Sequence, residues 1–323
     1  MKLKNTIICI AIAAAFTAPA LAQTVKGGRV VAPRVADPAQ VKPQAAGAKA
    51  APKAPQAETV SLPAISAEAI VAKNIAARGG LAAWQGVKSM SMEGMLDAGK
   101  RKRDGGDVVN INTKRAKAER LAEARKVAMG QAEAKPDDTI QLPFAMEMQR
   151  PMQKRLEVPF QGQKAVQVYD GKNGWKLRPF LGRHEVEAFT ATEAKAAAEQ
   201  QELDGPLVDY AAKGTKVEVA GGEKVEGRNA YKLKLTLKNG DVRHLWLDAE
   251  SFLDLKMEGA PRRMDGRMRT VETYFRDYRP LAGLMLPYVF ETRVEGIALS
   301  ERIVVERIAL NPPLENSRFS KPE

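Results

Sequence analysis

The stretch that most limits the fold of this chain runs from Tyr231 to Asp248 and reads YKLKLTLKNGDVRHLWLD. Its first half alternates apolar and polar residues with a period of two, which is typical of a β-strand with one buried face and one solvated face. The dipeptide Asn239-Gly240 favours a two-residue type I′ turn, so a second strand should return beside the first. The sequence therefore predicts an antiparallel hairpin.

The expected turn also sets the register of this hairpin. A two-residue loop places Leu235 opposite His244 and Leu233 opposite Trp246. Directly opposed residues share one face of a sheet. The predicted apolar face of the hairpin therefore carries Leu233, Leu235, Leu237, Val242, His244 and Trp246.

The rest of the second half repeats the strand pattern and predicts a meander built outward from this hairpin. Turn-forming glycines separate the segments. The expected strands are 215–219, 229–238, 241–248, 252–259, 267–278, 285–294 and 299–310.

The first half contains shorter strands and two helices. A helix should begin after Ser66, which can cap it, and end at Gly79-Gly80; a second helix is expected at 190–203. Two strand segments have their apolar positions at Phe144, Met146, Met148, Leu156 and Val158. A turn-forming run at 170–174 then leads into Trp175. Methionine-rich strands offer an adaptable surface for irregular ligands, although core packing is the ordinary use of each methionine.

Residues 1–22 are predicted to be a secretory signal. They combine a basic start at Lys2 and Lys4, an apolar run and the small-residue cleavage site Ala20-Leu21-Ala22, and the run is too short to span a bilayer. We expect export by the Sec route, cleavage after Ala22 and a periplasmic location. The only cysteine, Cys9, leaves with the signal, so the mature chain cannot use thiol catalysis or cysteine-bound metal.

Residues 23–63 are rich in alanine, proline and lysine and contain no aromatic residue. Such a segment cannot bury enough apolar surface to offset its ordering entropy, so we predict a disordered tether that acts as a spacer or docks a partner. The folded domain is expected at 64–323, with a charged insertion at about 99–140 that begins with Lys100-Arg101-Lys102-Arg103. The insertion is either a solvated loop or an electrostatic contact with a membrane surface.

The formal net charge is +12, of which Lys2 and Lys4 contribute two, so the mature chain keeps +10. In an exported protein this charge favours anionic lipid head groups over nucleic acid. The basic runs also lack the interleaved aromatic residues on which bases stack. We therefore expect a transient membrane contact and no binding of nucleic acid.

Residues for catalysis or metal binding are missing. The two histidines, His184 and His244, cannot form a metal cluster, and no nucleophile elbow, phosphate loop or dinucleotide fingerprint occurs. His184 is expected in a loop. His244 is a candidate contact for a ligand head group, or a histidine simply hydrogen-bonded in place. We expect no enzyme, no catalytic residue, no cofactor and no metal.

With the strands laid out, residues 66–98 and 141–319 resemble the periplasmic outer-membrane lipoprotein-sorting family, a lipoprotein carrier-like superfamily. The segments that carry the resemblance are Gln161–Trp175, Asp204–Tyr210, Tyr231–Asp248, Phe252–Lys256, Glu272–Phe275, Gly283–Pro287 and Leu310–Pro313. The resemblance implies a mainly β fold, in which one strongly curved antiparallel half-barrel has helices over its concave face and an acyl chain lies between them.

The resemblance and the residue pattern together predict a non-catalytic carrier that acts as a monomer and binds an acyl lipid or a lipoprotein. The alternative is an envelope sensor or scaffold that binds a protein partner through the same fold. The residues expected to line the apolar cavity are Leu233, Leu235, Leu237, Trp246, Phe144, Met146, Met148, Leu156, Val158 and Trp175, with His244 near the head group.

Overall fold

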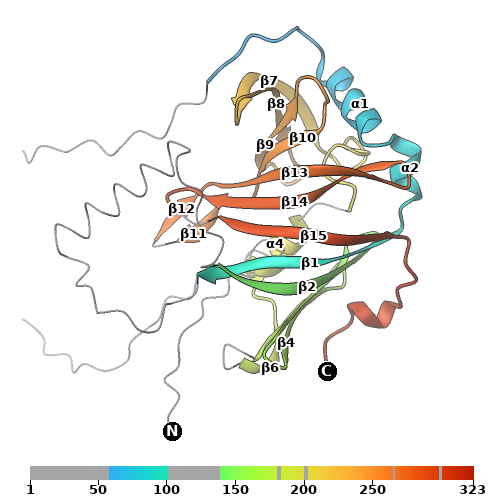
Figure 1. Cartoon of the computed structure of the whole chain (residues 1–323), viewed down its shortest axis with the longest axis vertical. Coiled ribbons are helices and arrows are strands. Elements are labelled where there is room, and N and C mark those ends of the chain that lie inside the picture. Colours follow the sequence, from blue (N-terminus) through green and yellow to red (C-terminus); the bar gives the residue numbers. More distant parts are fainter. Residues whose placement is uncertain (1–57, 101–138, 180–182, 200–202, 265, 298–299) are drawn as a thin grey trace, which may run out of the picture.

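A computed structural model of the protein describes residues 58–100, 139–179, 183–199, 203–264, 266–297 and 300–323 (Figure 1). The expected signal, most of the tether and most of the charged insertion lie outside these residues. The described part is mainly β and forms one large antiparallel sheet that does not close on itself. Among the described residues, no helix is long and apolar enough to cross a membrane.

The large sheet contains thirteen strands in the order β6-β5-β4-β3-β2-β1-β15-β14-β13-β10-β9-β8-β7. Its first six strands are β1 (Ser89–Lys100), β2 (Thr139–Gln149), β3 (Gln153–Phe160), β4 (Gln163–Tyr169), β5 (Gly174–Arg178) and β6 (Arg183–Ala188). The others are β7 (Lys216–Val225), β8 (Arg228–Thr236), β9 (Val242–Asp248), β10 (Asp254–Glu258), β13 (Val271–Leu281), β14 (Leu284–Val294) and β15 (Glu301–Leu310). The first strand and the last are therefore neighbours in the middle of the sheet.

The helices begin where the sequence predicts. In α1 (Ala67–Ala77) the Ser66 side chain accepts a hydrogen bond from the amide of Ala69 at 3.2 Å, so the expected cap is confirmed. Helix α2 (Leu81–Gly86) buries Trp84. Helix α4 (Ala191–Glu199) starts with a reciprocal capping box, since the Thr190 and Glu193 side chains each accept a bond from the other's backbone amide. A short 3₁₀ helix, η3 (Asn316–Phe319), lies near the C-terminus.

The predicted register of the central hairpin is wrong by one residue. Leu233 lies opposite Leu245, and Lys234 lies opposite His244. The loop contains three residues rather than two, because the amide of Leu237 donates to the carbonyl of Asp241 at 2.9 Å. Gly240 takes the positive φ of 85° that such a loop requires. Because side chains alternate, a slip of one residue moves His244, Trp246 and Val242 to the opposite face.

Helix α1 packs against one face of this region, the inner face. Ile70 and Val71 of α1 pack against leucines of β8 and β9, and all of these side chains are buried. The buried leucines of this cluster are Leu207, Leu233, Leu235, Leu245 and Leu247. In Figure 1, α1 lies beside the end of the sheet formed by β7 to β10. A second and larger core lies on the same face of β1, β2 and β3, and it includes Trp84 of α2 and Ala197 of α4.

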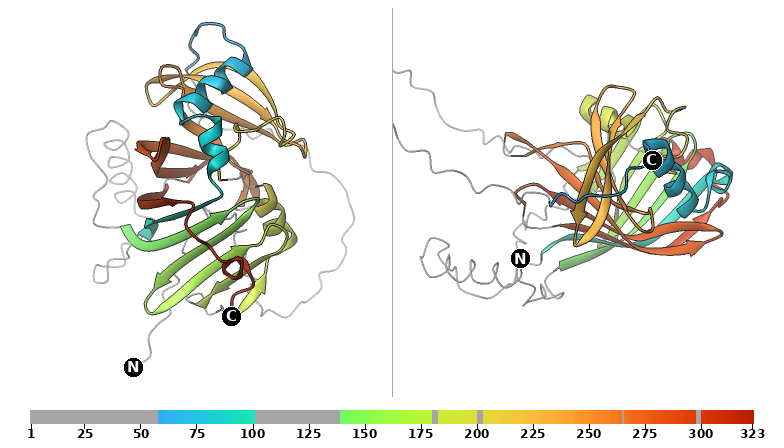
Figure 2. Two further views of the ribbon diagram at one scale, coloured as in Figure 1. Left: turned by 90° about the vertical axis from the view of Figure 1, so that its right-hand side faces the viewer. Right: turned by 90° about the horizontal axis from the view of Figure 1, so that it is seen from above.

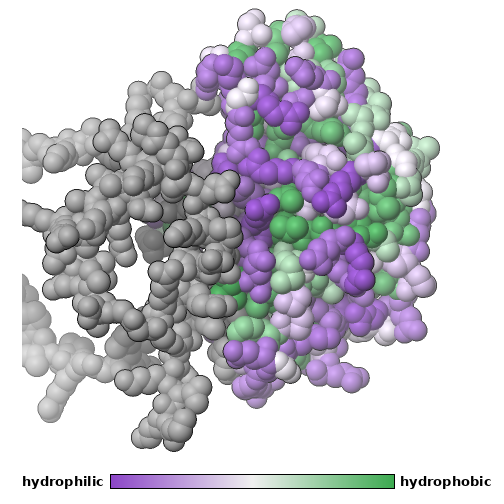
Figure 3. All heavy atoms as spheres, in the orientation of Figure 1, coloured by the Kyte–Doolittle hydropathy of each residue, from purple (hydrophilic) through white to green (hydrophobic). Residues whose placement is uncertain are grey.

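The outer face carries its own smaller clusters. Trp246 packs with Leu255 and Tyr274 there, and Val168 packs with Phe319 of η3. Around these clusters the outer surface is charged; for example, Arg293 pairs with Glu291 at 2.7 Å. On the side drawn in Figure 3, hydrophilic residues are accordingly interspersed with smaller hydrophobic patches.

Two further sequence predictions need correction. His184 lies in strand β6 and not in a loop. The strand expected at 267–278 is two strands, because β12 (Arg267–Arg269) pairs with β11 (Arg262–Met264) in a separate two-stranded sheet before β13 begins. Both errors arise in segments with many charged residues, where strand alternation is hard to recognise.

Residues 58–63, which the sequence assigns to the tether, lie along the β7 edge of the sheet. Thr59 forms a bridge with Glu223, and the amide of Val60 donates to the carbonyl of Gly222 at 3.0 Å. Gly222 is required at this contact, because a Cβ there would lie 2.6 Å from the carbonyl oxygen of Val60. This short segment therefore covers part of an edge that would otherwise have unpaired backbone groups.

Candidate functional site

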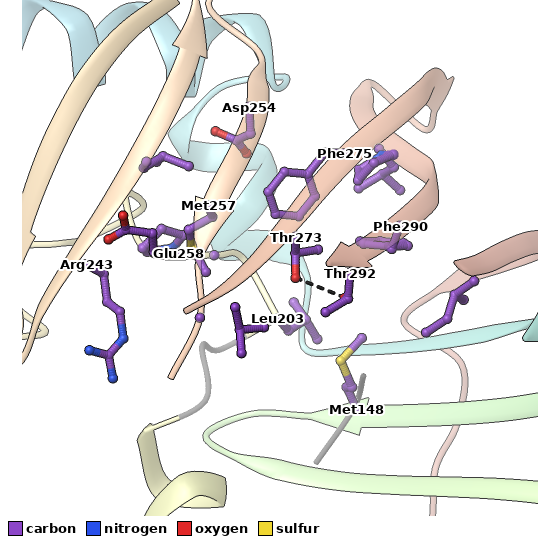
Figure 4. Close-up of a pocket in the computed structure, with 18 of the residues that line it drawn as sticks. Met148, Leu203, Arg243, Asp254, Met257, Glu258, Thr273, Phe275, Phe290 and Thr292 are labelled. Carbon is purple, nitrogen blue, oxygen red and sulfur yellow. Dashed lines mark hydrogen bonds between the residues drawn. The ribbon is translucent and has the colours of Figure 1, made fainter. Parts of the chain in front are cut away.

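An apolar pocket of about 370 Å³ opens on the inner face of the sheet. It is lined by strands on both sides of the central β15, and the segment that follows α4 contributes Leu203 and Pro206. Figure 4 shows Leu203, Met257, Phe275, Phe290 and Met148 arranged around this space. Its volume lies within the range of about 300–1,000 Å³ that is usual for small-molecule sites.

Long, unbranched side chains form one wall of the pocket. Met90 and Met92 of β1 lie opposite Met148 and Met146 of β2, respectively, so the four methionines share one face. Strand pairing brings them together, because each lies two residues from the next in its strand. A methionine wall can adapt its shape to an irregular apolar ligand.

The opposite wall is aliphatic and aromatic. It contains Leu235 and Leu245 from the paired strands β8 and β9, and Phe275 and Phe290 from β13 and β14. The two phenylalanine rings meet edge to face, with their centroids 5.9 Å apart. Beside them, the hydroxyls of Thr273 and Thr292 bond to each other at 3.1 Å, which satisfies both groups within an apolar surface (Figure 4).

Arg78 and Asp254 form a buried polar pair at the pocket. The Arg78 Nε lies 3.8 Å from an Asp254 carboxylate oxygen, and its guanidinium lies 4.5 Å from the centre of the Trp84 ring. The Arg78 Nη1 also donates to the carbonyl of Asp204 at 3.0 Å. Burial raises the pKa of Asp254, although the charge of Arg78 and a hydrogen bond from the Asn74 side-chain amide oppose that rise. These contacts attach the end of α1 to β10 and to the segment after α4.

Lys154 lines the methionine wall. It belongs to β3, lies opposite Met148 of β2 and so extends from the same face as the methionines. Loss of hydration in this environment lowers the pKa of Lys154 to about 8. A cationic amine in a largely apolar pocket can orient an amphipathic ligand that carries an anionic group.

Arg243 of β9 lies next to Leu235, at the position where the expected register would have placed His244. It lines the pocket, and its Nη2 lies 3.3 Å from an oxygen of Asp241. His244 instead lies on the other face, where its Nδ1 and an oxygen of Glu258 are 2.7 Å apart. The polar group at this point of the inner face is therefore an arginine.

The structure brings together four of the residues predicted to line the cavity, which are Leu235, Leu237, Met146 and Met148. Leu233, on the same face, is buried against α1 and does not line the pocket. Phe144, Leu156 and Val158 are buried in the core of β2 and β3. Leu233, Phe144, Leu156 and Val158 therefore extend from the same face as the pocket residues but are packed into the core.

Trp246 and Trp175 lie on the outer face, which corrects the prediction that they line the cavity. The Trp246 indole donates to Glu223 at 2.7 Å, and the ammonium of Lys256 lies 3.9 Å from its ring centre. Trp175 pairs with Val168 of β4, whose side chain packs under Phe319. Both tryptophans therefore cover the back of the sheet.

Sequence reasoning missed Lys154, Arg243 and Arg78. The signal for Lys154 was present, because it lies two and four residues before Leu156 and Val158 and so shares their face. Arg243 was hidden by the register error. Arg78 could not be found from periodicity, because it follows the last helical residue of α1.

Within the described residues, no group of three or more histidine, cysteine, aspartate or glutamate side chains could hold a metal ion. Two of the arginines that line the pocket have ion-pair partners, since Arg78 pairs with Asp254 and Arg262 pairs with Glu301.

No protein-family model matches the chain, and no curated protein matches it in sequence. Among solved structures, a LolA superfamily protein from Nitrosomonas europaea matches with a TM-score of 0.48 and 12% identity, over 80% of this chain and 99% of that one. A DUF1329 family protein from Desulfovibrio piger matches with a TM-score of 0.47 and 12% identity, over 79% and 97%. An outer-membrane lipoprotein-sorting protein domain from Vibrio parahaemolyticus gives a TM-score of 0.44 and 12% identity, over 78% and 95%.

Proposed function

We propose that this protein is a non-catalytic periplasmic carrier that holds the acyl chain of a lipid or lipoprotein in the pocket on the inner face of its sheet. The observation that carries the proposal is the pocket itself, which is lined by methionine, leucine and phenylalanine and has a volume of about 370 Å³. Side chains of the protein leave this space open, although cores are normally close-packed.

The proposal includes a bent sheet with helices over its concave face. Met92 of β1 and Leu245 of β9 line the same pocket, although β15, β14, β13 and β10 separate their strands in the sheet. Strands lie about 4.8 Å apart, so side chains this distant in a flat sheet would not meet around one cavity. Figure 2 is consistent with a half-barrel, because its two views show the β7–β9 end and the β1–β6 end at different inclinations.

Burial of the acyl chain would supply most of the affinity. Each buried CH₂ group contributes about 0.8 kcal/mol. The cations of the pocket, Lys154 among them, would set the position of the polar end. A carrier needs no reactive group, which fits a site in which Arg78 and Asp254 pair with each other.

Mass spectrometry of a solvent extract from protein purified without detergent tests the proposal. We expect an acyl lipid to copurify in near-stoichiometric amount. A lipid-free extract, combined with failure to bind a fluorescent fatty acid added from solution, would contradict the carrier. A tight protein partner recovered with lipid-free protein would instead support the envelope sensor or scaffold.

Filling the pocket with a larger side chain tests which face of the sheet binds the acyl chain. Met92→Trp adds a large ring to the pocket wall and should reduce fatty-acid binding at least tenfold. Met95→Trp is the matched control, because Met95 lies in the same strand but does not line the pocket. Circular dichroism and melting temperature check that both variants fold. Equal binding by the two folded variants would place the ligand elsewhere.

A further inference from the structure

We propose that the hairpin of β11 and β12 is a docking element for an anionic lipid surface. It comprises Arg262–Met264 and Arg267–Arg269 and forms a sheet of its own. The chain leaves the large sheet after β10 and returns at β13, where the amide of Gly259 donates to the carbonyl of Val271 at 2.9 Å. Figure 1 shows this hairpin at the side of the molecule, beside the end of β13 and β14.

One face of the hairpin is bound to the neighbouring turn. Arg262 and Arg269 lie opposite each other and share this face. Arg262 pairs with Glu301 at 3.0 Å, and Arg269 donates to the carbonyl of Glu295 at 2.9 Å. A two-stranded hairpin is marginally stable alone, so these bonds hold it in place.

The other face is turned away from those contacts. It carries Arg263 and Met268, which lie opposite each other, and both are exposed. The Met268 side chain is 60% exposed, which is the largest value among the exposed large hydrophobic residues of the described chain. Arg267, next to the hairpin turn, is exposed as well. Met268 therefore shares one face with Arg263, and Arg267 extends from the opposite face beside the turn. An exposed apolar side chain with exposed guanidinium groups on the same hairpin suits the boundary between head groups and acyl chains.

The adjacent turn between β14 and β15 extends this surface. Ile297 is 36% exposed there. Two hydrogen bonds attach the turn to Thr270, the residue that follows β12. The Glu295 amide donates to the carbonyl of Thr270 at 2.9 Å, and the Glu295 carboxylate accepts from the Thr270 amide at 3.2 Å. Met268 of the hairpin and Ile297 of the turn therefore lie in two segments that these hydrogen bonds connect.

Charge favours a lipid over a protein as the occupant. The described acidic neighbours of the hairpin, Glu295 and Glu301, are engaged by Thr270 and Arg262. The exposed arginines therefore present positive charge, which anionic head groups attract. The position also fits, because Gly259, Ala260 and Arg262 at the base of the hairpin line the pocket.

This inference does not require that the pocket binds an acyl chain, because surface docking and uptake can be measured separately. The test is flotation of the ligand-free protein with vesicles of phosphatidylcholine alone, and of phosphatidylcholine mixed equally with phosphatidylglycerol. We expect binding to the mixed vesicles only, with weaker binding at high salt.

The double variant Arg263→Gln with Arg267→Gln should lose affinity for the mixed vesicles by about thirtyfold, since each cation near an anionic surface contributes about fivefold. Met268→Ser should lower it further. The charge-retaining variant Arg263→Lys with Arg267→Lys should bind like the wild type. The control is Lys172→Gln with Lys216→Gln, which neutralises two exposed lysines elsewhere and should leave most of the binding intact.

Fatty-acid uptake from solution, measured without vesicles, should be unchanged in all of these variants if the hairpin acts only in docking. The inference is overturned if the wild type does not float with the mixed vesicles. It is also overturned if the hairpin variants bind as well as the lysine control. Either result would leave an acidic protein as the partner for this surface.

Discussion

Lys154 is the residue whose placement has the clearest energetic consequence. Its amine lies at the methionine wall, and loss of hydration lowers its pKa to about 8 from the usual 10.5. A depressed lysine pKa means that the unfolded chain binds the proton more tightly than the folded chain. The charged form of Lys154 therefore destabilises the ligand-free protein at neutral pH.

Lys154→Met should stabilise the ligand-free protein at pH 7, by at most about 3 kcal/mol, because it removes a poorly hydrated charge and keeps an unbranched side chain. The direction in which stability changes with pH follows from the same pKa shift of Lys154. As pH rises from about 8 to 10.5, the cost of charging Lys154 in the folded state disappears, so this residue makes the wild type relatively more stable. Urea unfolding of both proteins at pH 7 and pH 10 measures this change.

The difference in unfolding free energy between the two proteins should therefore shrink at the higher pH. A constant difference would show that the amine is well hydrated or that another bond compensates for its burial. Lys172→Met is a suitable control, because Lys172 is exposed in the turn before β5. It should show no comparable change.

Periodicity in the sequence identified two of the four methionines in the wall. Met146 and Met148 alternate with polar residues, and both line the pocket. It could not separate pocket residues from core residues, because Phe144 and Leu156 follow the same alternation. They differ from the pocket methionines only in the other segments that pack against them. That difference depends on α2, α4 and the segment after α4, which reach this face from distant parts of the sequence.

At the scale of elements, the central hairpin shows that the length of one loop determines which side chains lie on each face of the sheet. The Asn239-Gly240 signal correctly located the turn, but Lys238 also belongs to the loop. Two-residue and three-residue loops both use glycine with a positive φ, so the dipeptide alone does not distinguish them. One extra loop residue exchanges Trp246 for Leu245 on the inner face.

A disulfide test distinguishes the two registers. Lys234→Cys with His244→Cys should form a cross-link under mild oxidation, because these residues are directly opposed and share the outer face. Leu235→Cys with His244→Cys should not, because its two side chains extend from opposite faces. Cys9 is the single cysteine of the sequence, so in protein produced without residues 1–22 gel mobility and mass give a direct measurement. The reverse result would restore the two-residue loop.

At the scale of the whole molecule, the mainly β class and most strands could be predicted, whereas the order of the strands could not. Nearly every sequential pair of strands is also a pair in the sheet, which the pattern of turns implies. Two joins are not between sequential strands: β10 pairs with β13 across the β11–β12 hairpin, and β1 pairs with β15. The second connects segments about two hundred residues apart and leaves no local signal. The β11–β12 excursion was missed because arginines occupy both of its faces.

The join between β1 and β15 depends on Gly94. This residue lies at an irregularity in the pairing, and a Cβ there would lie 2.0 Å from the carbonyl oxygen of Val304. Gly94→Ala should therefore destabilise the protein by at least about 2 kcal/mol, since backbone must move to admit the methyl group. Gly86→Ala is the control, because nothing lies within 4 Å of its Cβ position. Denaturant midpoints compare the two; equal values would mean that the strands separate easily at this point.

The central position of β15 has a consequence for how the chain reaches its native state. The strands from β1 to β6 can assemble as soon as they are made, but the flank of β1 stays unpaired until the residues near position 301 arrive. Such distant pairing implies a high contact order and slow folding. During synthesis or export, the incomplete chain would expose the unpaired, aggregation-prone edge of β1 for a long interval. A chaperone that shields β1 would therefore benefit this protein more than one that assists its later hairpins.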